Sequence, residues 1–250
     1  INENPYLDNQ LKQLEMQFLA TKKRLENKFG AKKFIVYFQS FTNTYAPFST
    51  LKALYEKALS FDNVIGLSIG TRTDCVTDEI LDYLVDLSKT KEIWVEYGIQ
   101  SFYDETLVRV NRGDSVSNMK HWIKRTKEKG LNVCGHLIYG LPGENQEMML
   151  ETFKQTIELN VDSIKFHPLY VVKNTLLTNE FKKGKFTPIS EELYIDTVVK
   201  SIINLPSNIS IQRITAGIDD DTLLSPSWCR DKHTQMKNIR LALEKEGFNY

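Results

Sequence analysis

Six strand-length apolar runs recur along the chain, separated by segments with helical patterns. Successive runs begin 30, 29, 39, 31 and 46 residues apart. Apolar residues repeat at a spacing of three to four in the gaps, which is typical of amphipathic helices. This alternation predicts an α/β fold of buried parallel strands covered by helices, either a (β/α) barrel or an open doubly wound sheet. The runs are residues 34–38, 64–69, 93–99, 132–139, 163–171 and 209–214.

An apolar stripe lies before the first of these runs and predicts a helix over residues 6–29. A helix that opens a series of βα units implies a strand before it. The chain also begins at Ile1 rather than at methionine. We therefore expect the intact protein to have a further amino-terminal piece. The stripe consists of Leu7, Leu11, Leu14, Phe18, Leu25 and Phe29.

The composition narrows the class of protein. With 250 residues, of which 41% are hydrophobic, the chain can bury a large core. Lysine plus arginine number 32, as do aspartate plus glutamate, so no overall basic field indicates a nucleic-acid or membrane partner. A polyanion would need a local basic patch. No apolar run approaches the roughly 20 residues that cross a bilayer. We expect a soluble, cytoplasmic protein without a membrane partner.

The three cysteines carry little information about chemistry. Cys75, Cys134 and Cys229 are far apart and have no CxxC-type spacing. Neither a disulfide framework nor a local metal motif follows from them. Free cysteine is among the most buried residue types, so we expect all three to be buried.

Polar side chains stand at the ends of most of the predicted strands. In parallel α/β folds ligands bind at the carboxyl ends of strands, so these residues are the candidates for function. Each one alone could equally cap a helix or line a barrel rim. Together they predict a shared polar cavity. They are Ser40 and Thr42, on either side of Phe41; Thr71 and Arg72; Gln100; His136; Lys165, His167 and Lys173; and Arg213.

Other motifs are weaker. The chain has no Walker loop, GxGxxG fingerprint or nucleophile elbow, which removes the commonest phosphate- and acyl-transfer interpretations. The turn GLPGE at 140–144 could bind an anion through its backbone amides, or could simply be a tight turn that starts a helix. The basic segment 182–185 is of a kind that is usually just solvated. The segment from 223 to 233 could stack on nucleic acid or cap the barrel.

Several of these strings resemble a known family. The stretches GIQSFYDETLVRVNRG (98–113) and HLIYGLPGE (136–144) are similar to radical S-adenosylmethionine (SAM) enzymes of the coproporphyrinogen-oxidase-like and elongator-catalytic-subunit-like branches. YFQSFTNTYAP, GLSIGTRTDC, IKFHPLYVVKNT and QRIT look like the narrower YhcC/YtqA family. The resemblance implies a partial (β/α) TIM-like barrel over residues 1–205 that lacks its first strand and cluster loop. A strand and helix extension, 206–250, would pack on this barrel.

The resemblance also assigns residues to SAM. It implies that Gln100 and Arg112 contact the cofactor, since amide and guanidinium groups suit ribose, methionine and carboxylate groups. By the same resemblance, Ser40, Phe41 and Thr42 occupy the segment that holds the methionine amino group, and Leu169 lies near the sixth-strand segment that contacts the adenine. His136 stands where the branch has an acidic ribose contact. Gly70 replaces another acidic residue of the branch and leaves Thr71 and Arg72 as its substitutes, and Phe41 replaces a glycine.

The family's CxxxCxxC loop, which holds a 4Fe-4S cluster, is absent from the chain. The family places it just before a helix like 6–29, so we expect the cluster cysteines upstream of residue 1 and expect the chain alone to be inactive. The resemblance implies a 5′-deoxyadenosyl radical that abstracts hydrogen, in modification of the wobble uridine of tRNA. A flavodoxin or ferredoxin would supply the electron. A porphyrin-like substrate is the less favoured expectation.

Lys165, His167 and Arg213 are the residues expected to act on the substrate side. Lys165 and Arg213 could instead be structural charges paired with acids of neighbouring strands. Two other functions stay open. One is a barrel protein that binds SAM or RNA without radical chemistry, favoured if the intact protein lacks the cysteines. The other is a phosphate-binding barrel enzyme, which would need an anion site at the GLPGE turn and no dependence on SAM.

Overall fold

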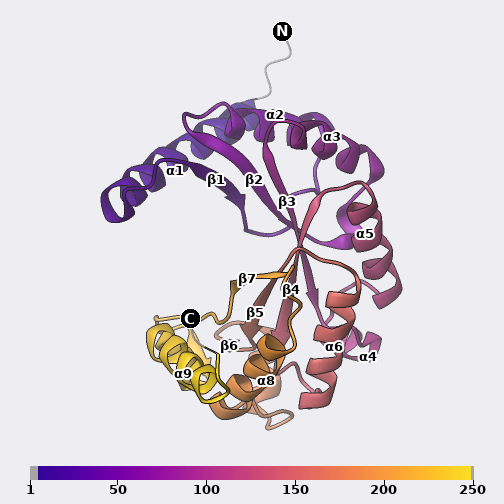
Figure 1. Cartoon of the computed structure of the whole chain (residues 1–250), viewed down its shortest axis with the longest axis vertical. Coiled ribbons are helices and arrows are strands. Elements are labelled where there is room, and N and C mark those ends of the chain that lie inside the picture. The colour runs from indigo at the N-terminus through magenta and orange to yellow at the C-terminus, as the bar shows by residue number, and fades with distance from the viewer. Residues whose placement is uncertain (1–4, 249–250) are drawn as a thin grey trace. The chain divides into compact units, whose positions relative to one another are not determined.

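A computed structural model describes residues 5–248 and shows strands and helices that alternate along the chain (Figure 1). The six main strands have the sheet order β1-β2-β3-β4-β5-β7. The strands are β1 (Phe34–Phe38), β2 (Val64–Thr71), β3 (Glu92–Gln100), β4 (Asn132–Tyr139), β5 (Ser163–Pro168), β6 (Val171–Val172), β7 (Ser210–Arg213) and β8 (Leu223–Ser225). The helices are α1 (Pro5–Phe29), α2 (Phe48–Leu59), α3 (Asp78–Ser88), α4 (Asp104–Arg109), α5 (Val116–Glu128), α6 (Gln146–Glu158), α7 (Leu176–Lys182), α8 (Glu191–Ile203) and α9 (Lys232–Lys245), with short 3-10 turns at Thr73–Cys75 and Ser227–Arg230.

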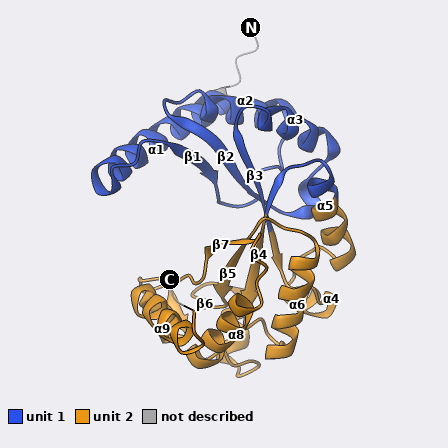
Figure 2. Ribbon diagram, viewed as in Figure 1, with its two compact units in different colours: residues 1–97, 125–133 blue, residues 98–124, 134–250 orange. Residues whose placement is uncertain are grey.

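The chain divides into two compact units (Figure 2). The first, unit 1, contains residues up to 97 together with 125–133. The second, unit 2, contains 98–124 and the residues from 134 onward. The boundary cuts through β3 and β4, so each of these strands contributes to both units.

Unit 1 is built on the parallel strands β1, β2 and the first part of β3. The run 64–69 is apolar because β2 is buried along nearly its whole length. A Cβ at Gly66 would lie 2.0 Å from the carbonyl oxygen of Glu92, so only glycine lets β3 approach there. Helix α3 begins where the Thr77 side chain accepts a hydrogen bond from the Ile80 amide, a role that threonine favours at a helix start. The predicted helix 6–29 is confirmed as α1, and its Phe18 stacks on Phe61.

Unit 2 is built on β4, β5 and β7, which also run parallel. Its core is aromatic: the rings of Tyr139 on β4 and Phe166 on β5 lie 5.4 Å apart, and Phe153 of α6 packs on Phe166. The Tyr139 hydroxyl is completely buried and shares a 2.8 Å hydrogen bond with Ser201 of α8. Satisfying this hydroxyl allows a tyrosine to occupy the core.

The prediction of one strand over 163–171 was wrong in its extent. The β5–β7 pairing ends at Lys165 and Arg213, and the β4–β5 pairing ends at Tyr139 and Pro168, where the amide of Leu169 donates to the carbonyl of Tyr139. Pro168 has no N–H to donate to a further strand. The next two residues form β6, which pairs antiparallel with β8.

The predicted α/β class with parallel strands and covering helices is confirmed. Each of the five remaining apolar runs forms a strand, and the observed ends differ from the predicted ones by at most two residues. Among the helices between residues 5 and 248, none is both long enough and apolar enough to span a bilayer.

Candidate functional site

In unit 1 the predicted residues lie where β1 and β2 end. Asn43 ties these ends together, because its side-chain amide donates to the carbonyls of Phe38 at 3.0 Å and Gly70 at 2.8 Å. The buried hydroxyl of Thr71 lies 2.5 Å from that of Thr44, so it already has a partner within the chain. Ser40 and Thr42 are the exposed and half-exposed members of the same loop.

Arg72 also has a partner in unit 1. Its Nε and Nη2 atoms donate to the two carboxylate oxygens of Asp74 at 2.7 and 2.6 Å. This bidentate pair lowers the pKa of Asp74, chiefly through the hydrogen bond. The pair fixes the direction of the guanidinium at the end of β2.

Phe41 has an unusual backbone for its residue type. Its φ is +63°, in the left-handed region that favours glycine, and its side chain is 99% exposed. The sequence resemblance expects a glycine here. The backbone therefore keeps a glycine-like conformation although the residue carries a ring.

Gln100 ends β3 with φ at +68°. The amide of Ser101 donates to the carbonyl of Ile99 at 2.9 Å, closing a three-residue turn around Gln100. Such turns with a positive central φ are rare and strained. The turn redirects the chain at the residue predicted to hold the cofactor.

Arg112 returns to the strand that Gln100 ends. Helix α4 is followed by Asn111 with φ at +53°, and the Arg112 amide donates to the Leu107 carbonyl, a typical helix C-terminal turn. The Arg112 Nη2 atom then donates to the carbonyl of Gly98 at 2.5 Å. The fold thus brings Gln100 and Arg112 to the same end of β3.

Three basic residues form a row across neighbouring strands of unit 2. His136 on β4 is the register partner of Lys165 on β5, which in turn is the partner of Arg213 on β7. Lys165 is only 7% exposed. Register partners project from the same face of a sheet, so these three side chains share that face. We call His136, Lys165 and Arg213 the basic row.

His167 lies two residues beyond Lys165 on β5, and its pKa is lowered. Its pKa is lowered mainly by burial and further by Arg213 and His136, while a hydrogen bond with the Pro168 carbonyl opposes the shift. Leu169 is half-buried beside it, at the end of β5. Lys173 lies apart, exposed and paired with Asp221 at 3.2 Å.

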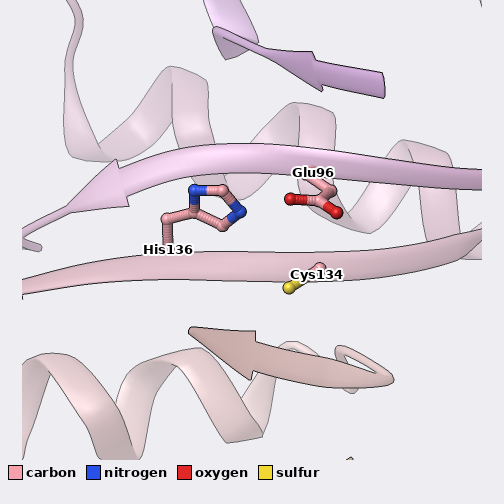
Figure 3. Close-up of side chains that lie close together, drawn as sticks. All are labelled: Glu96, Cys134 and His136. Carbon is pink, nitrogen blue, oxygen red and sulfur yellow. The ribbon is translucent and has the colours of Figure 1, made fainter. Parts of the chain in front are cut away.

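Two carboxylates were not among the site residues predicted from the sequence. Glu96 is 2% exposed in the middle of β3 and accepts a hydrogen bond from Ser68; a lone acid within the apolar run IWVEYGI was the available signal. Figure 3 shows its carboxylate, and shows Cys134 and His136 two residues apart on β4. Alternate strand residues share a face, which places Cys134 on the face of the basic row.

Glu144 is the second missed carboxylate. It accepts a hydrogen bond from Ser101, the residue after Gln100, and burial raises its pKa. The GLPGE segment itself is a tight turn, closed by the Glu144 amide donating to the Leu141 carbonyl at 3.0 Å. Helix α6 then starts with Asn145 as its cap. No local pattern could have indicated the contact between Ser101 and Glu144.

Comparison with known proteins shows the family of this chain. Residues 13–156 match the Radical SAM superfamily, and residues 161–245 match the Radical_SAM C-terminal domain. The chain belongs to the radical SAM superfamily.

Named relatives place this radical SAM chain more narrowly. It is 37% identical to Protein YhcC of Escherichia coli over 230 residues, covering 92% of the chain and 74% of YhcC. It is 34% identical to YtqA of Bacillus subtilis, covering 97% of the chain and 75% of YtqA. These relatives confirm the predicted YhcC/YtqA-like family. The protein is accordingly an enzyme of the radical SAM class.

More distant relatives carry more specific names. The chain is 31% identical to the tRNA uridine(34) acetyltransferase of Methanocaldococcus infernus, over 62% of the chain and 29% of that protein. The structure of Elp3 from the same organism, with its N-terminus deleted, superimposes with a TM-score of 0.76 at 23% identity. It covers 94% of this chain and 60% of the Elp3 chain. The radical SAM partial-barrel fold expected from the sequence is therefore confirmed.

Radical SAM proteins use two groups, SAM and a 4Fe-4S cluster, and the residues present fit the first of them. The amide of Gln100 and the guanidinium of Arg112, held at one strand end, are the donor types that suit SAM. The cysteines do not fit an iron–sulfur cluster. Cys134 and Cys229 are buried, and burial raises the pKa of Cys229 to about 12, which keeps it a thiol rather than a thiolate ligand. Cys75 is only half-buried, contrary to expectation.

Proposed function

We propose that this radical SAM enzyme uses a 5′-deoxyadenosyl radical to abstract hydrogen during modification of the wobble uridine of tRNA. The observation that carries the SAM part is the return of Arg112 to the end of β3, where it bonds Gly98 beside Gln100. The tRNA part is supported by the likeness to a tRNA uridine(34) acetyltransferase. That likeness covers 62% of the chain, so the substrate rests on similarity and on the charges described below.

Gln100 and Arg112 would hold SAM from one strand end. The turn at Gln100 ends β3 at this residue, and its side-chain amide would bind a ribose or the methionine group. The Arg112 guanidinium is anchored by Gly98, which orients its planar fork for a carboxylate. When bound, SAM would supply the 5′-deoxyadenosyl radical that takes a hydrogen atom from the substrate, with one electron coming from the reduced cluster and methionine leaving.

The basic row would act on the substrate side. A tRNA nucleotide carries phosphate, and an acid-bearing modified uridine would carry a carboxylate as well. His136, Lys165 and Arg213 can neutralise such groups and orient them, because their side chains project from one face of three adjacent strands. His167, kept neutral by its lowered pKa, can donate or accept a hydrogen bond there.

The test uses the intact gene product, reconstituted anaerobically with iron and sulfide and reduced with flavodoxin or ferredoxin. We expect 5′-deoxyadenosine to form, and nucleoside mass spectrometry to show a changed wobble uridine in added tRNA. Arg112→Ala should abolish both signals. The matched control is Arg240→Ala on the exposed face of α9.

Each outcome separates the parts of the proposal. 5′-Deoxyadenosine without a change in tRNA would retain the radical chemistry and overturn the substrate. SAM binding without cleavage would favour a SAM-binding protein that performs no radical chemistry. An Arg112→Ala variant as active as Arg240→Ala would remove Arg112 from the cofactor site.

A further inference from the structure

A cavity lies in unit 2, and its lining includes neither Gln100, nor Arg112, nor any residue of the basic row. Its volume is about 480 Å³. It is lined by the turn Gly140–Glu144 after β4, the loop from Lys185 to Ser190 between α7 and α8, and single residues of three helices: Arg109 of α4, Met149 of α6 and Leu193 of α8. The space can hold a phosphate group together with several waters, each of which takes about 30 Å³ in the liquid.

Two cations line this cavity from separate segments. Arg109 and Lys185 are both exposed, and within residues 5–248 neither side chain has an ion pair or a hydrogen bond. Lys200 and Lys129 of the same chain, by contrast, bind neighbouring carboxylates. Like charges that face one space repel each other, and an anion placed between them relieves that repulsion.

The GLPGE turn positions one of these cations. Gly143 has φ at +94°, and a Cβ on it would lie 3.1 Å from Arg109 Nη1. The absence of a side chain at Gly143 therefore lets the guanidinium lie against the turn. Two features therefore favour glycine at position 143: its left-handed backbone conformation and the close approach of Arg109.

The acid in the cavity wall does not neutralise these cations. Glu144 is the carboxylate among the lining residues that the structure describes, and it accepts its hydrogen bond from Ser101. Burial raises its pKa, and within residues 5–248 it forms no ion pair with Arg109 or Lys185. The lining thus offers an anion two cations and the hydroxyls of Thr187 and Ser190.

The surroundings extend the basic character beyond the cavity. Lys182 and Lys183 lie next to the cavity loop in the sequence, are exposed and have no ion pair among residues 5–248. Phe186 of the lining is half-buried, with its ring 6.2 Å from that of Phe181. Proteins that bind single-stranded nucleic acid commonly combine cations for the backbone with aromatic rings for the bases.

We propose that this cavity binds a backbone phosphate of the RNA substrate, with Arg109 and Lys185 as its ligands. The proposal rests on the proposed function for the identity of the RNA, and it adds a docking point separate from the reacting nucleotide. The net charge of zero over the whole chain makes such a local patch necessary for RNA binding.

The experiment compares two double variants of the intact protein. Arg109→Gln with Lys185→Gln removes the charges of the cavity. Lys237→Gln with Arg240→Gln removes one lysine and one arginine from the exposed face of α9, and is the matched control. Binding of tRNA is followed by fluorescence anisotropy from 50 to 200 mM salt, and binding of inorganic phosphate by the amide NMR signal of Gly143.

We expect the cavity variant to bind tRNA about tenfold more weakly than wild type, because hydrogen bonds from cations to phosphate are stronger than those between neutral groups. Its salt slope should fall by roughly 0.7 to 0.9, because one phosphate fewer is neutralised. The Gly143 signal should shift with phosphate in wild type and in the control, and should not shift in the cavity variant.

Equal tRNA affinity and salt slope in the two double variants, with no phosphate shift at Gly143, would overturn the cavity while leaving the tRNA function intact. A Gly143 shift that the cavity variant abolishes, without any tRNA binding by wild type, would keep an anion site for free phosphate and overturn both the RNA ligand and the tRNA function. Thermal unfolding of both variants checks that they remain folded.

Discussion

The Arg112 guanidinium donates a 2.5 Å hydrogen bond to the carbonyl of Gly98, fourteen residues earlier in the chain. This bond fixes an arginine at the end of β3, two residues from Gln100. A left-handed Asn111 after α4 makes the return of the chain feasible. The relationship turns two separated polar residues into one candidate site for SAM.

Replacing Arg112 should therefore affect the cofactor more than the fold. Arg112→Lys keeps the charge but loses the planar fork, and we expect SAM affinity to fall about tenfold, with a greater loss for Arg112→Ala. Loss of the bond to Gly98 should cost about 1 kcal/mol of stability in either variant. Calorimetric titration with SAM measures the first effect and urea unfolding the second. Unchanged SAM affinity in Arg112→Ala would contradict the assignment.

Gln100 should be sensitive to the shape of its replacement. Gln100→Gly can adopt φ of +68° freely, whereas Gln100→Val places a β-branched residue in a conformation that costs about 1–2 kcal/mol. We expect Gln100→Gly to unfold at or above the wild-type temperature and Gln100→Val to unfold below it. Both should bind SAM more weakly. Equal melting temperatures for the two variants would show that the turn is not under strain.

Phe41→Gly should stabilise the protein. The ring is 99% exposed and gains nothing from burial, while φ of +63° carries a cost that glycine avoids. After allowance for the greater freedom of glycine in the unfolded chain, we expect a gain of about 0.5–1 kcal/mol. Urea unfolding measures it. The control is Tyr45→Gly, 80% exposed on the same loop without a positive φ, which should be destabilised.

His167 should make stability depend on pH. Its pKa lies below the ordinary 6.5, first because of burial and then because of Arg213 and His136. The unfolded chain then takes up the proton more readily than the folded one, so the contribution is complete above pH 6.5 and is lost as the pH falls toward the folded pKa. In His167→Gln this part of the pH dependence should vanish. Thermal unfolding between pH 7 and 5 compares the two, and parallel curves would contradict the shift.

Much of the fold could be predicted from periodicity. The run 132–139 corresponds to β4 residue for residue, and α1 follows the apolar stripe from Leu7 to Phe29. Because one face of each helix and the whole of each parallel strand are buried, apolar residues recur in the sequence at the spacing of these elements. The prediction of one strand over 163–171 was wrong because pairing decides where a strand ends. Here β6 pairs with β8 and does not extend β5.

The candidate site was only partly accessible to the same reasoning. Strand-end position indicated Gln100, His136, Lys165 and Arg213, and resemblance indicated Arg112. Neither could show that Thr71 is engaged by Thr44, that Arg72 is engaged by Asp74, or that Ser101 binds Glu144. These are contacts between side chains far apart in sequence or at a turn, which leave no periodic trace.

The sequence alone thus determined the class of fold, the order of its strands along the chain and the strand ends at which polar groups gather, because local periodicity reflects which faces are buried. Tertiary structure decided which of those groups meet. The return of Arg112 to Gly98, the alignment of His136, Lys165 and Arg213 into one row, and the placing of Arg109 against Gly143 all depend on strand register and helix ends. Register and helix ends are set by the packing of the whole core, and no single segment of the chain specifies them.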